Sequence, residues 1–228
     1  MRLASQVGPG TFLGRVDPSD RADLLALGGE RRFPQGAHVI VQGDHSDTVF
    51  VLLEGLVKVV LTTPGGRSVV LCVLGPGELL GEFEAIRGDG APREAGNVAA
   101  TPIAVRALAG ADLRAYLETH PRATLILLQV ILGRFGSADR RLVDSGTLDT
   151  PHRLARLLLE LTDQYGRPGD AGIRLELPLA QDELATLIAA SRESVVRAFA
   201  SLRRQGYIVT GRRTVTLCDV DGLRRYAS

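Results

Sequence analysis

The stretch from residue 33 to residue 108 constrains the fold most, because it contains strand-like segments and little helical period. Its β-branched apolar residues come in runs of strand length. Turn signals such as Pro64-Gly65-Gly66 and Gly75-Pro76-Gly77 separate them. Short strands at such regular spacing predict an antiparallel barrel or roll. The runs are HVIVQGD, TVFVLLEG, LVKVVLTT, SVVLCVLG and IAVRAL.

The residues that follow, 111–145, have a helical period, with a local break at His120-Pro121. Beyond the break, apolar and small residues recur at alternating steps of three and four over roughly three heptads. Such an a/d seam fits either a helix packed on its own roll or a coiled coil between two copies of the chain. We favour the dimer, because the stripe is long and runs to the domain boundary. The seam comprises Leu128, Ile131, Phe135, Ala138, Leu142 and Ser145.

The last third of the chain has the pattern of a winged helix-turn-helix. Three helices are expected, and the segment YIVTGRRTVTL after them reads as a hairpin with Gly211 in its turn. The predicted fold class is therefore α+β, with a β-roll (jelly roll), a long dimerisation helix and a winged helix-turn-helix. Their expected ranges are 1–110, 111–147 and 148–228, and the last part holds helices at 152–164, 179–190 and 191–206.

Composition excludes several classes of protein. The net charge is +1, but residues 151–228 carry 12 Lys+Arg against 9 Asp+Glu, so the last third is mildly basic. Cys72 and Cys218 are too few and too far apart for a disulfide framework or a metal site, which suits a reducing cytoplasm. No apolar run approaches the ~20 residues of a membrane span, and no signal peptide is visible. No catalytic motif is evident, so we expect no enzyme, no catalytic residue and no metal.

The segment SRESVVRAFASLRRQGYIV, residues 191–209, separates into two helical faces. Ser191 is a good N-cap. At about 100° per residue, one face is apolar and the other carries Glu193, Arg197, Ala200 and Arg204, while Arg192 lies in the first turn. Arginine can bind guanine O6 and N7, and glutamate can accept from cytosine N4. The expected apolar face consists of Val195, Phe199 and Leu202, and the expected DNA-binding residues are Ser191, Arg192, Glu193, Arg197, Arg204, Arg212 and Arg213.

The motif Ser191-Arg192-Glu193-Ser194-Val195-Val196-Arg197 resembles the SRE(T/S)VxR recognition helix of the cyclic-AMP receptor protein/FNR superfamily of bacterial transcription factors. GELLGEF, residues 77–83, and PREA, residues 92–95, are similar to the phosphate-binding cassette of that superfamily's cyclic-nucleotide effector domain. The resemblance implies a homodimeric, sequence-specific DNA-binding regulator with a TGTGA-like inverted repeat as target. It also makes RNA polymerase a candidate partner. One departure is Ala180, where the family has a threonine N-cap.

The resemblance also implies a ligand site, and two of its positions disagree with cyclic AMP. Glu82 matches the ribose-binding glutamate, Gly81 precedes it, and Arg93 matches the phosphate-binding arginine. Glu94 stands where cyclic-AMP binders have Ser or Thr, and a carboxylate there repels the phosphate or neutralises Arg93. Ala138 has no hydroxyl for adenine.

Three alternatives for the ligand therefore stay open: cyclic AMP, a different small ligand or nucleotide, or a roll that has lost its ligand. In the last case Glu82 and Arg93 would pair with each other or with Glu94. A nucleotide-sensing module that acts through protein contacts is the alternative function. The intact trio of Arg192, Glu193 and Arg197 argues against it.

Overall fold

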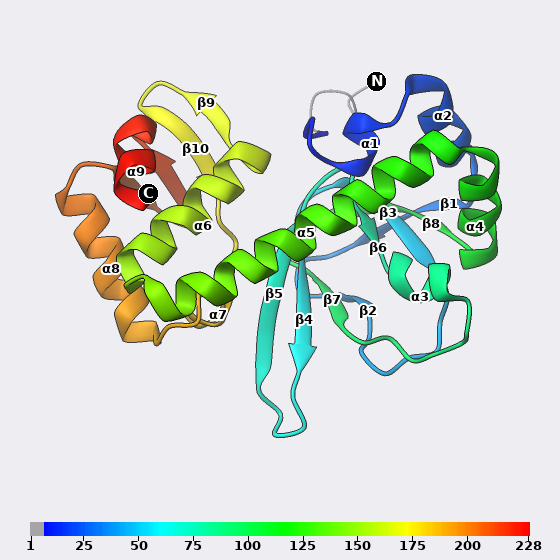
Figure 1. Cartoon of the computed structure of the whole chain (residues 1–228), viewed down its shortest axis with the longest axis horizontal. Helices are drawn as coiled ribbons and strands as arrows, with labels where there is room; N and C mark the ends of the chain where they lie inside the picture. The colour runs from blue at the N-terminus through cyan, green and yellow to red at the C-terminus, as the bar shows by residue number, and fades with distance from the viewer. Residues whose placement is uncertain (1–6) are drawn as a thin grey trace. The chain divides into compact units, whose positions relative to one another are not determined.

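The structure, a computed structural model, describes residues 7–228, which form two compact units (Figure 1). The first ends at Phe135 and the second begins at Gly136. This division falls within helix α5 (Pro121–Thr147). Helix α4 (Gly110–Thr119) ends one residue before α5, so the expected break at His120-Pro121 is confirmed as the junction of two helices.

The first unit contains a roll of two four-stranded antiparallel sheets, with strand orders β1-β8-β3-β6 and β2-β7-β4-β5. The expected antiparallel roll is therefore confirmed. Each apolar run in the sequence forms one strand, and β1, β6 and β7 were not expected. The strands are β1 (Gly29–Phe33), β2 (His38–Ile40), β3 (Val49–Glu54), β4 (Val57–Thr62), β5 (Ser68–Leu74), β6 (Leu79–Leu80), β7 (Gly96–Ala99) and β8 (Ile103–Leu108).

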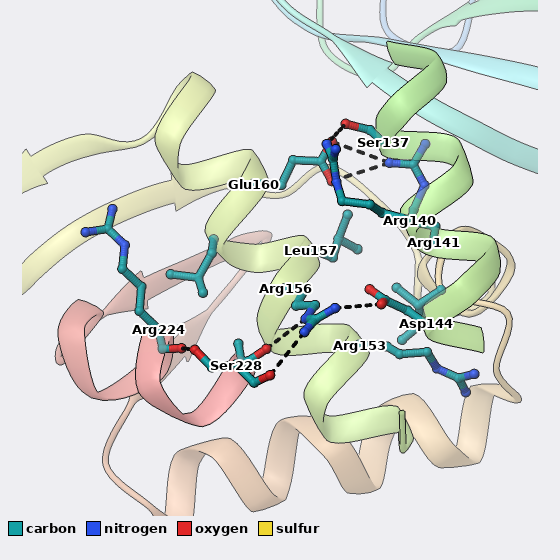
Figure 2. Close-up of a pocket in the computed structure, with 13 residues that line it drawn as sticks. Ser137, Arg140, Arg141, Asp144, Arg153, Arg156, Leu157, Glu160, Arg224 and Ser228 are labelled. Atoms are coloured by element: carbon teal, nitrogen blue, oxygen red, sulfur yellow. Dashed lines mark hydrogen bonds and ion pairs between the residues drawn. The ribbon is translucent and has the colours of Figure 1, made fainter. Parts of the chain in front are cut away.

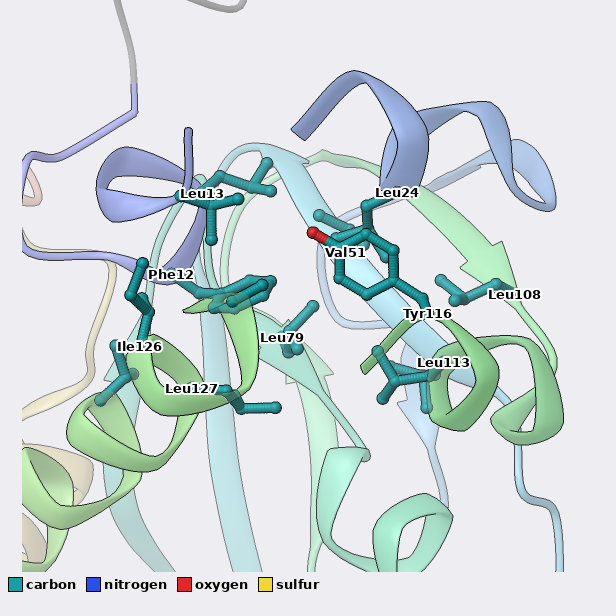
Figure 3. Close-up of a cluster of buried hydrophobic side chains, with 14 of the residues drawn as sticks. Phe12, Leu13, Leu24, Val51, Leu79, Leu108, Leu113, Tyr116, Ile126 and Leu127 are labelled. Carbon is teal, nitrogen blue, oxygen red and sulfur yellow. The ribbon is translucent and has the colours of Figure 1, made fainter. Parts of the chain in front are cut away.

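Strand β3 is apolar from Val49 to Leu53 because both of its faces are buried there. Phe50 and Leu52 pack in the cluster between the two sheets. Val51 points the other way, into a cluster formed with helices α1 (Phe12–Arg15), α2 (Pro18–Ala26), α4 and the first half of α5 (Figure 3). Figure 3 shows Leu24, Leu113 and Tyr116 around this second cluster. The helices therefore cover the outer face of one sheet and fix α5 to it.

A short helix, α3 (Glu82–Arg87), follows strand β6 and begins after a left-handed glycine. Gly81 has a φ of +76°, and a Cβ there would lie 2.7 Å from Ile40 Cδ1 and 2.8 Å from Arg93 Nη1. A larger residue would therefore clash with both neighbours. This glycine lets the backbone turn tightly enough to bring Glu82 and Arg93 into the same part of the roll.

The expected seam on α5 differs from the exposed apolar stripe at one position in its first half, Ile131. Ile131 packs partly buried against the cluster of Figure 3, because this side of the helix faces the roll. Leu132, beside it, is 59% exposed. The exposed apolar residues of this half of α5 again follow steps of three, four and three: Leu125, Leu128, Leu132 and Phe135.

The second unit is a helix-turn-helix with a four-stranded sheet of order β11-β12-β10-β9. Helix α6 packs against α8 and α9, and α7 packs against α8. The helices expected at 152–164, 179–190 and 191–206 are present; the hairpin β9–β10 and the last helix were not expected. The elements are α6 (Thr150–Tyr165), β9 (Arg167–Gly169), β10 (Gly172–Glu176), α7 (Gln181–Leu187), α8 (Arg192–Arg204), β11 (Ile208–Gly211), β12 (Thr214–Leu217) and α9 (Val220–Ala227).

Candidate nucleic-acid interface and effector site

Helix α8 is held in place by its apolar face. Val195 and Leu202 are fully buried and Phe199 nearly so, as the helical period predicts. Ser191 caps the helix, because its hydroxyl accepts from the Ser194 backbone N–H at 3.2 Å. The cap satisfies one of the backbone donors that a helix N-terminus leaves open. The first turn of α8 is thereby fixed in position.

The opposite face of α8 presents its charged groups to solvent. Arg192, Glu193 and Arg197 are all exposed, and Arg204 continues the face. Arg197 donates to the Ser194 hydroxyl at 3.0 Å. The pKa of Glu193 is lowered, first by a hydrogen bond from its own backbone N–H and then by the Ser191 hydroxyl. Glu193 is therefore an ionised acceptor between two cationic donors, in the two turns that enter a DNA groove in helix-turn-helix proteins.

The wing ends in two arginines. Gly211 is the last residue of β11 and pairs with Thr214, so the expectation that it lies in the turn is wrong. The two-residue turn is formed by Arg212 and Arg213 themselves, both exposed, and Arg213 has a φ of +56°. A tight turn therefore carries two positive charges at the tip of the hairpin, where they can contact phosphate.

The N-cap of helix α7 is Ala180, whose methyl side chain cannot accept a hydrogen bond. The Glu183 carboxylate accepts from the Ala180 backbone N–H at 2.8 Å, which is half of a capping box. The turn that leads to α8 contains Ala189 with a φ of +51°, a left-handed conformation that alanine rarely adopts. A tight but strained turn thus joins the two helices of the motif.

In the roll, Arg93 is buried, and both terminal nitrogens of its guanidinium donate to the chain, while its Nε has no hydrogen-bond partner among the described residues. Its Nη1 donates to the Gly81 carbonyl at 2.8 Å and its Nη2 to the Thr48 carbonyl at 2.6 Å. Its ionic partner is Glu84, with Nη1 2.8 Å from Glu84 Oε2. The expectation that Arg93 pairs with Glu82 or Glu94 is therefore wrong. Sequence reasoning missed Glu84, although its position two residues after Glu82 in the same short helix was a visible signal.

Glu82 has a different partner, Arg134 on α5. Arg134 Nη1 lies 2.6 Å from Glu82 Oε1, and Nη2 donates to Glu78. Burial raises the pKa of Glu82, Arg134 opposes this rise, and the Glu78 carboxylate adds to it. Burial acts to lower the pKa of Arg134, but the two carboxylates outweigh it and raise this pKa, so Arg134 stays charged. One cation therefore serves two buried acids, and Arg134 is a site residue that the sequence did not reveal.

Neither the Glu94 side chain nor Ala138 belongs to these buried pairs. The Glu94 side chain is 76% exposed and pairs with Arg87 at 2.9 Å. Only its backbone N–H turns toward the site, where it donates to Glu84 Oε1 at 3.1 Å. Ala138 belongs to the second unit and is exposed. The carboxylate that meets Arg93 is therefore not the one next to it in the sequence.

Comparisons with known proteins agree with both halves of this description. Residues 30–120 match the family model of the cyclic nucleotide-binding domain, and residues 152–226 match that of the Crp-like helix-turn-helix domain. The CRP-like cAMP-activated global transcriptional regulator of Mycobacterium tuberculosis is 30% identical over 96% of each chain. The chain belongs to the Crp/Fnr superfamily of transcription regulators.

Other Crp/Fnr members have the same extent. The cyclic AMP receptor protein of Thermus thermophilus is 31% identical over 91% of this chain and 93% of its own. A solved CRP/FNR-family transcriptional regulator from Thermus thermophilus superposes with a TM-score of 0.70 at 26% identity, covering 87% of this chain and 98% of that one. This Crp/Fnr protein is thus a DNA-binding transcription regulator with a cyclic nucleotide-binding domain, and not an enzyme.

Two further observations concern metal sites and membrane spans in the described part of the chain. Within residues 7–228, no group of three or more His, Cys, Asp or Glu side chains is placed to hold a metal ion. None of the helices in that range combines the length and apolar character that a bilayer span requires.

An arginine-rich cavity of about 550 Å³ lies in the second unit of this regulator, between α6, α9 and the end of α5 (Figure 2). Arg156 donates to Asp144 at 2.6 Å and to the Ala227 carbonyl, and Arg141 pairs with Glu160 at 3.3 Å. These guanidinium groups are matched by the chain's own acceptors. We therefore assign the cavity no ligand.

Proposed function

We propose that this regulator is a homodimer that recognises a TGTGA-like inverted repeat through Arg192, Glu193 and Arg197. The observation that carries the proposal is the exposure of all three side chains on the first two turns of a capped helix. Two arginines suit guanine O6 and N7, and an ionised glutamate suits the cytosine N4 amino group. Such a trio can read alternating G·C pairs in one half-site.

Phosphate contacts would come from residues that surround this helix. Arg204 follows it, and Arg212 and Arg213 form the tip of the wing. Charges in such positions orient a protein on the duplex without carrying sequence information. We also propose RNA polymerase as a partner, because a DNA-bound regulator acts on the enzyme that transcribes the adjacent gene.

The proposed dimer uses the exposed apolar stripe of α5. Leu125, Leu128, Leu132 and Phe135 are each at least half exposed and have the spacing of a coiled-coil seam. A stripe of this kind on a monomer surface is costly in water unless a second apolar surface covers it. The other face of this part of α5 packs on the roll, so the stripe is left for a second copy.

The test is a labelled duplex with the sequence TGTGA-N6-TCACA and no added nucleotide. We expect binding in the nanomolar to micromolar range, and a curve no tighter than for scrambled DNA would contradict base readout.

Sedimentation of Leu132→Glu tests the dimer: this variant should be monomeric, while Leu71→Glu, at an exposed position of β5, should sediment like the wild type.

We also propose that the cyclic-AMP site of this regulator is altered. Every polar group in the roll that the resemblance assigns to the nucleotide already has a partner from the chain: Arg93 has Glu84, and Glu82 has Arg134. Calorimetric titration with cyclic AMP should show weak binding or none, and a submicromolar Kd would contradict this part of the proposal.

A further inference from the structure

In the roll, the carboxylate of Glu84 is held by two hydrogen-bond donors. The Glu84 side chain is 11% exposed, and each of its carboxylate oxygens has a donor of a different kind. Oε2 accepts from the buried guanidinium of Arg93 at 2.8 Å, and Oε1 accepts from the backbone N–H of Glu94 at 3.1 Å. A guanidinium and a backbone amide that converge on two oxygens of one anion form an oxyanion site.

The site is built for an anion and not merely for a surface ion pair. Arg93 is buried and held rigidly by the carbonyls of Thr48 and Gly81. Carbonyls orient the guanidinium but cannot neutralise it, and a buried charge without a counter-charge is strongly destabilising. Some anion must therefore sit on Arg93 in the folded protein, and Glu84 is the one that the chain supplies.

The same two donors suit the oxygens of a phosphodiester monoanion. A phosphodiester carries one negative charge and presents two oxygens on one atom, as a carboxylate does. The two anions cannot share Arg93 without strong like-charge repulsion in a buried setting. One of them has to leave before the other can bind.

We propose that Glu84 is a tethered anion that occupies the phosphate subsite of the roll, so that a cyclic nucleotide binds only when Glu84 is displaced. The inference deepens the proposed alteration of the cyclic-AMP site and rests on the roll being the sensor of this regulator. It names Glu84, and not Glu94, as the residue that decides whether a cyclic nucleotide enters.

Two properties of Glu84 make it an effective competitor. It is attached to the site through one turn of α3, so its effective concentration at Arg93 is that of an intramolecular ligand, in the millimolar range or above. Burial works to raise its pKa, but the hydrogen bonds from Arg93 and from the Glu94 backbone outweigh burial, and the net pKa is lowered. The carboxylate thus stays ionised at neutral pH and stays paired with Arg93.

The test is calorimetric titration of the full-length protein with cyclic AMP and with cyclic GMP. Glu84→Gln removes the charge, keeps the shape and frees Arg93 for an external anion. We expect it to bind at least one of the two nucleotides about tenfold tighter than the wild type, or more. Asp89→Asn is the matched control, because that carboxylate lies on the surface against Arg87 and is no part of the subsite, and it should bind like the wild type.

Equal affinities of folded Glu84→Gln and wild type for both nucleotides would overturn the proposal, as would an equal gain in Asp89→Asn. If Glu84→Gln does not fold, Glu84→Asp keeps the charge but shortens its reach, and it should still bind tighter than the wild type; unchanged binding would overturn the proposal. The titration contains no DNA, and the duplex assay contains no nucleotide. A failure of base readout is therefore distinguishable from a failure of the tethered anion.

Discussion

The roll and helix α8 differ in the burial and pairing of their charged residues. In the roll, Arg93 and Glu82 are buried, and each has an ionic partner within the same unit. On α8, Arg192, Glu193 and Arg197 are exposed. Burial makes an unmatched charge costly, while solvent screens an exposed one. Arg93 and Glu82 are therefore paired within the first unit, while the charged groups of α8 stay accessible to a binding partner.

The largest effect should come from breaking the buried cluster around Arg134. Arg134→Met leaves Glu78 and Glu82 buried together without a cation, which should cost about 3–5 kcal/mol of folding free energy at pH 7. Urea denaturation measures this loss. Arg140→Met, at an exposed position of the same helix, should change stability by less than about 0.5 kcal/mol.

The pH dependence of Arg134→Met has a definite sign. The pKa of Glu82 is raised above its ordinary 4.5, so between these two values the folded protein binds more protons than the unfolded chain. Stability from this group therefore falls as the pH rises through that window. Without Arg134 the pKa of Glu82 in the folded state rises further, so this pH window widens. The loss of folding free energy relative to the wild type should therefore shrink when the pH is lowered toward 5. A deficit independent of pH would mean that packing, and not charge, was lost.

The two regions also differed in how far the sequence could predict them. The faces of α8 follow from a local period, and its cap is a hydroxyl three residues before the backbone N–H that donates to it, so the expectations for Ser191, Val195 and Leu202 were correct. The partner of Glu82 lies 52 residues away on α5, and no local pattern encodes that contact. The expected seam misplaced Ile131 for a related reason: the roll, and not the heptad, decides which side of α5 is buried.

The second effect in size is the loss of the Glu84 charge. Glu84→Gln should lower stability by about 1.5–3 kcal/mol at pH 7, because a charged hydrogen bond to a buried guanidinium is lost. The pKa of Glu84 is lowered in the fold, so its contribution is complete above the unfolded value near 4.5 and is lost as the pH falls through the folded value. Denaturation curves of variant and wild type should therefore converge in acid and diverge toward pH 7.

The recognition helix should respond in the reverse manner, with a loss of binding and no loss of stability. Arg197→Ala should weaken binding to the TGTGA repeat by about 1–3 kcal/mol and relax its base preference. Its folding free energy should change by less than about 0.5 kcal/mol, because the side chain is exposed. Fluorescence anisotropy on cognate and scrambled duplexes measures the first effect, and urea denaturation the second.

Arg212→Ala in the wing is the matched control for Arg197→Ala. It should weaken binding to both duplexes alike and reduce the slope of log K against log salt by about one. An equal loss on the two duplexes for Arg197→Ala would place Arg197 among the phosphate contacts instead.

The smallest effect concerns the turn between α7 and α8, where Ala189 has a φ of +51°. Ala189→Gly removes the steric cost of this conformation and should raise stability by about 0.5–1 kcal/mol. Ala190→Gly, the next residue and outside the left-handed region, should lower stability by a similar amount. Both variants should bind the TGTGA repeat as the wild type does. If Ala189→Gly instead weakens DNA binding while stabilising the fold, the strained turn sets the angle of α8. The recognition helix would then also depend on internal structure, as the roll does.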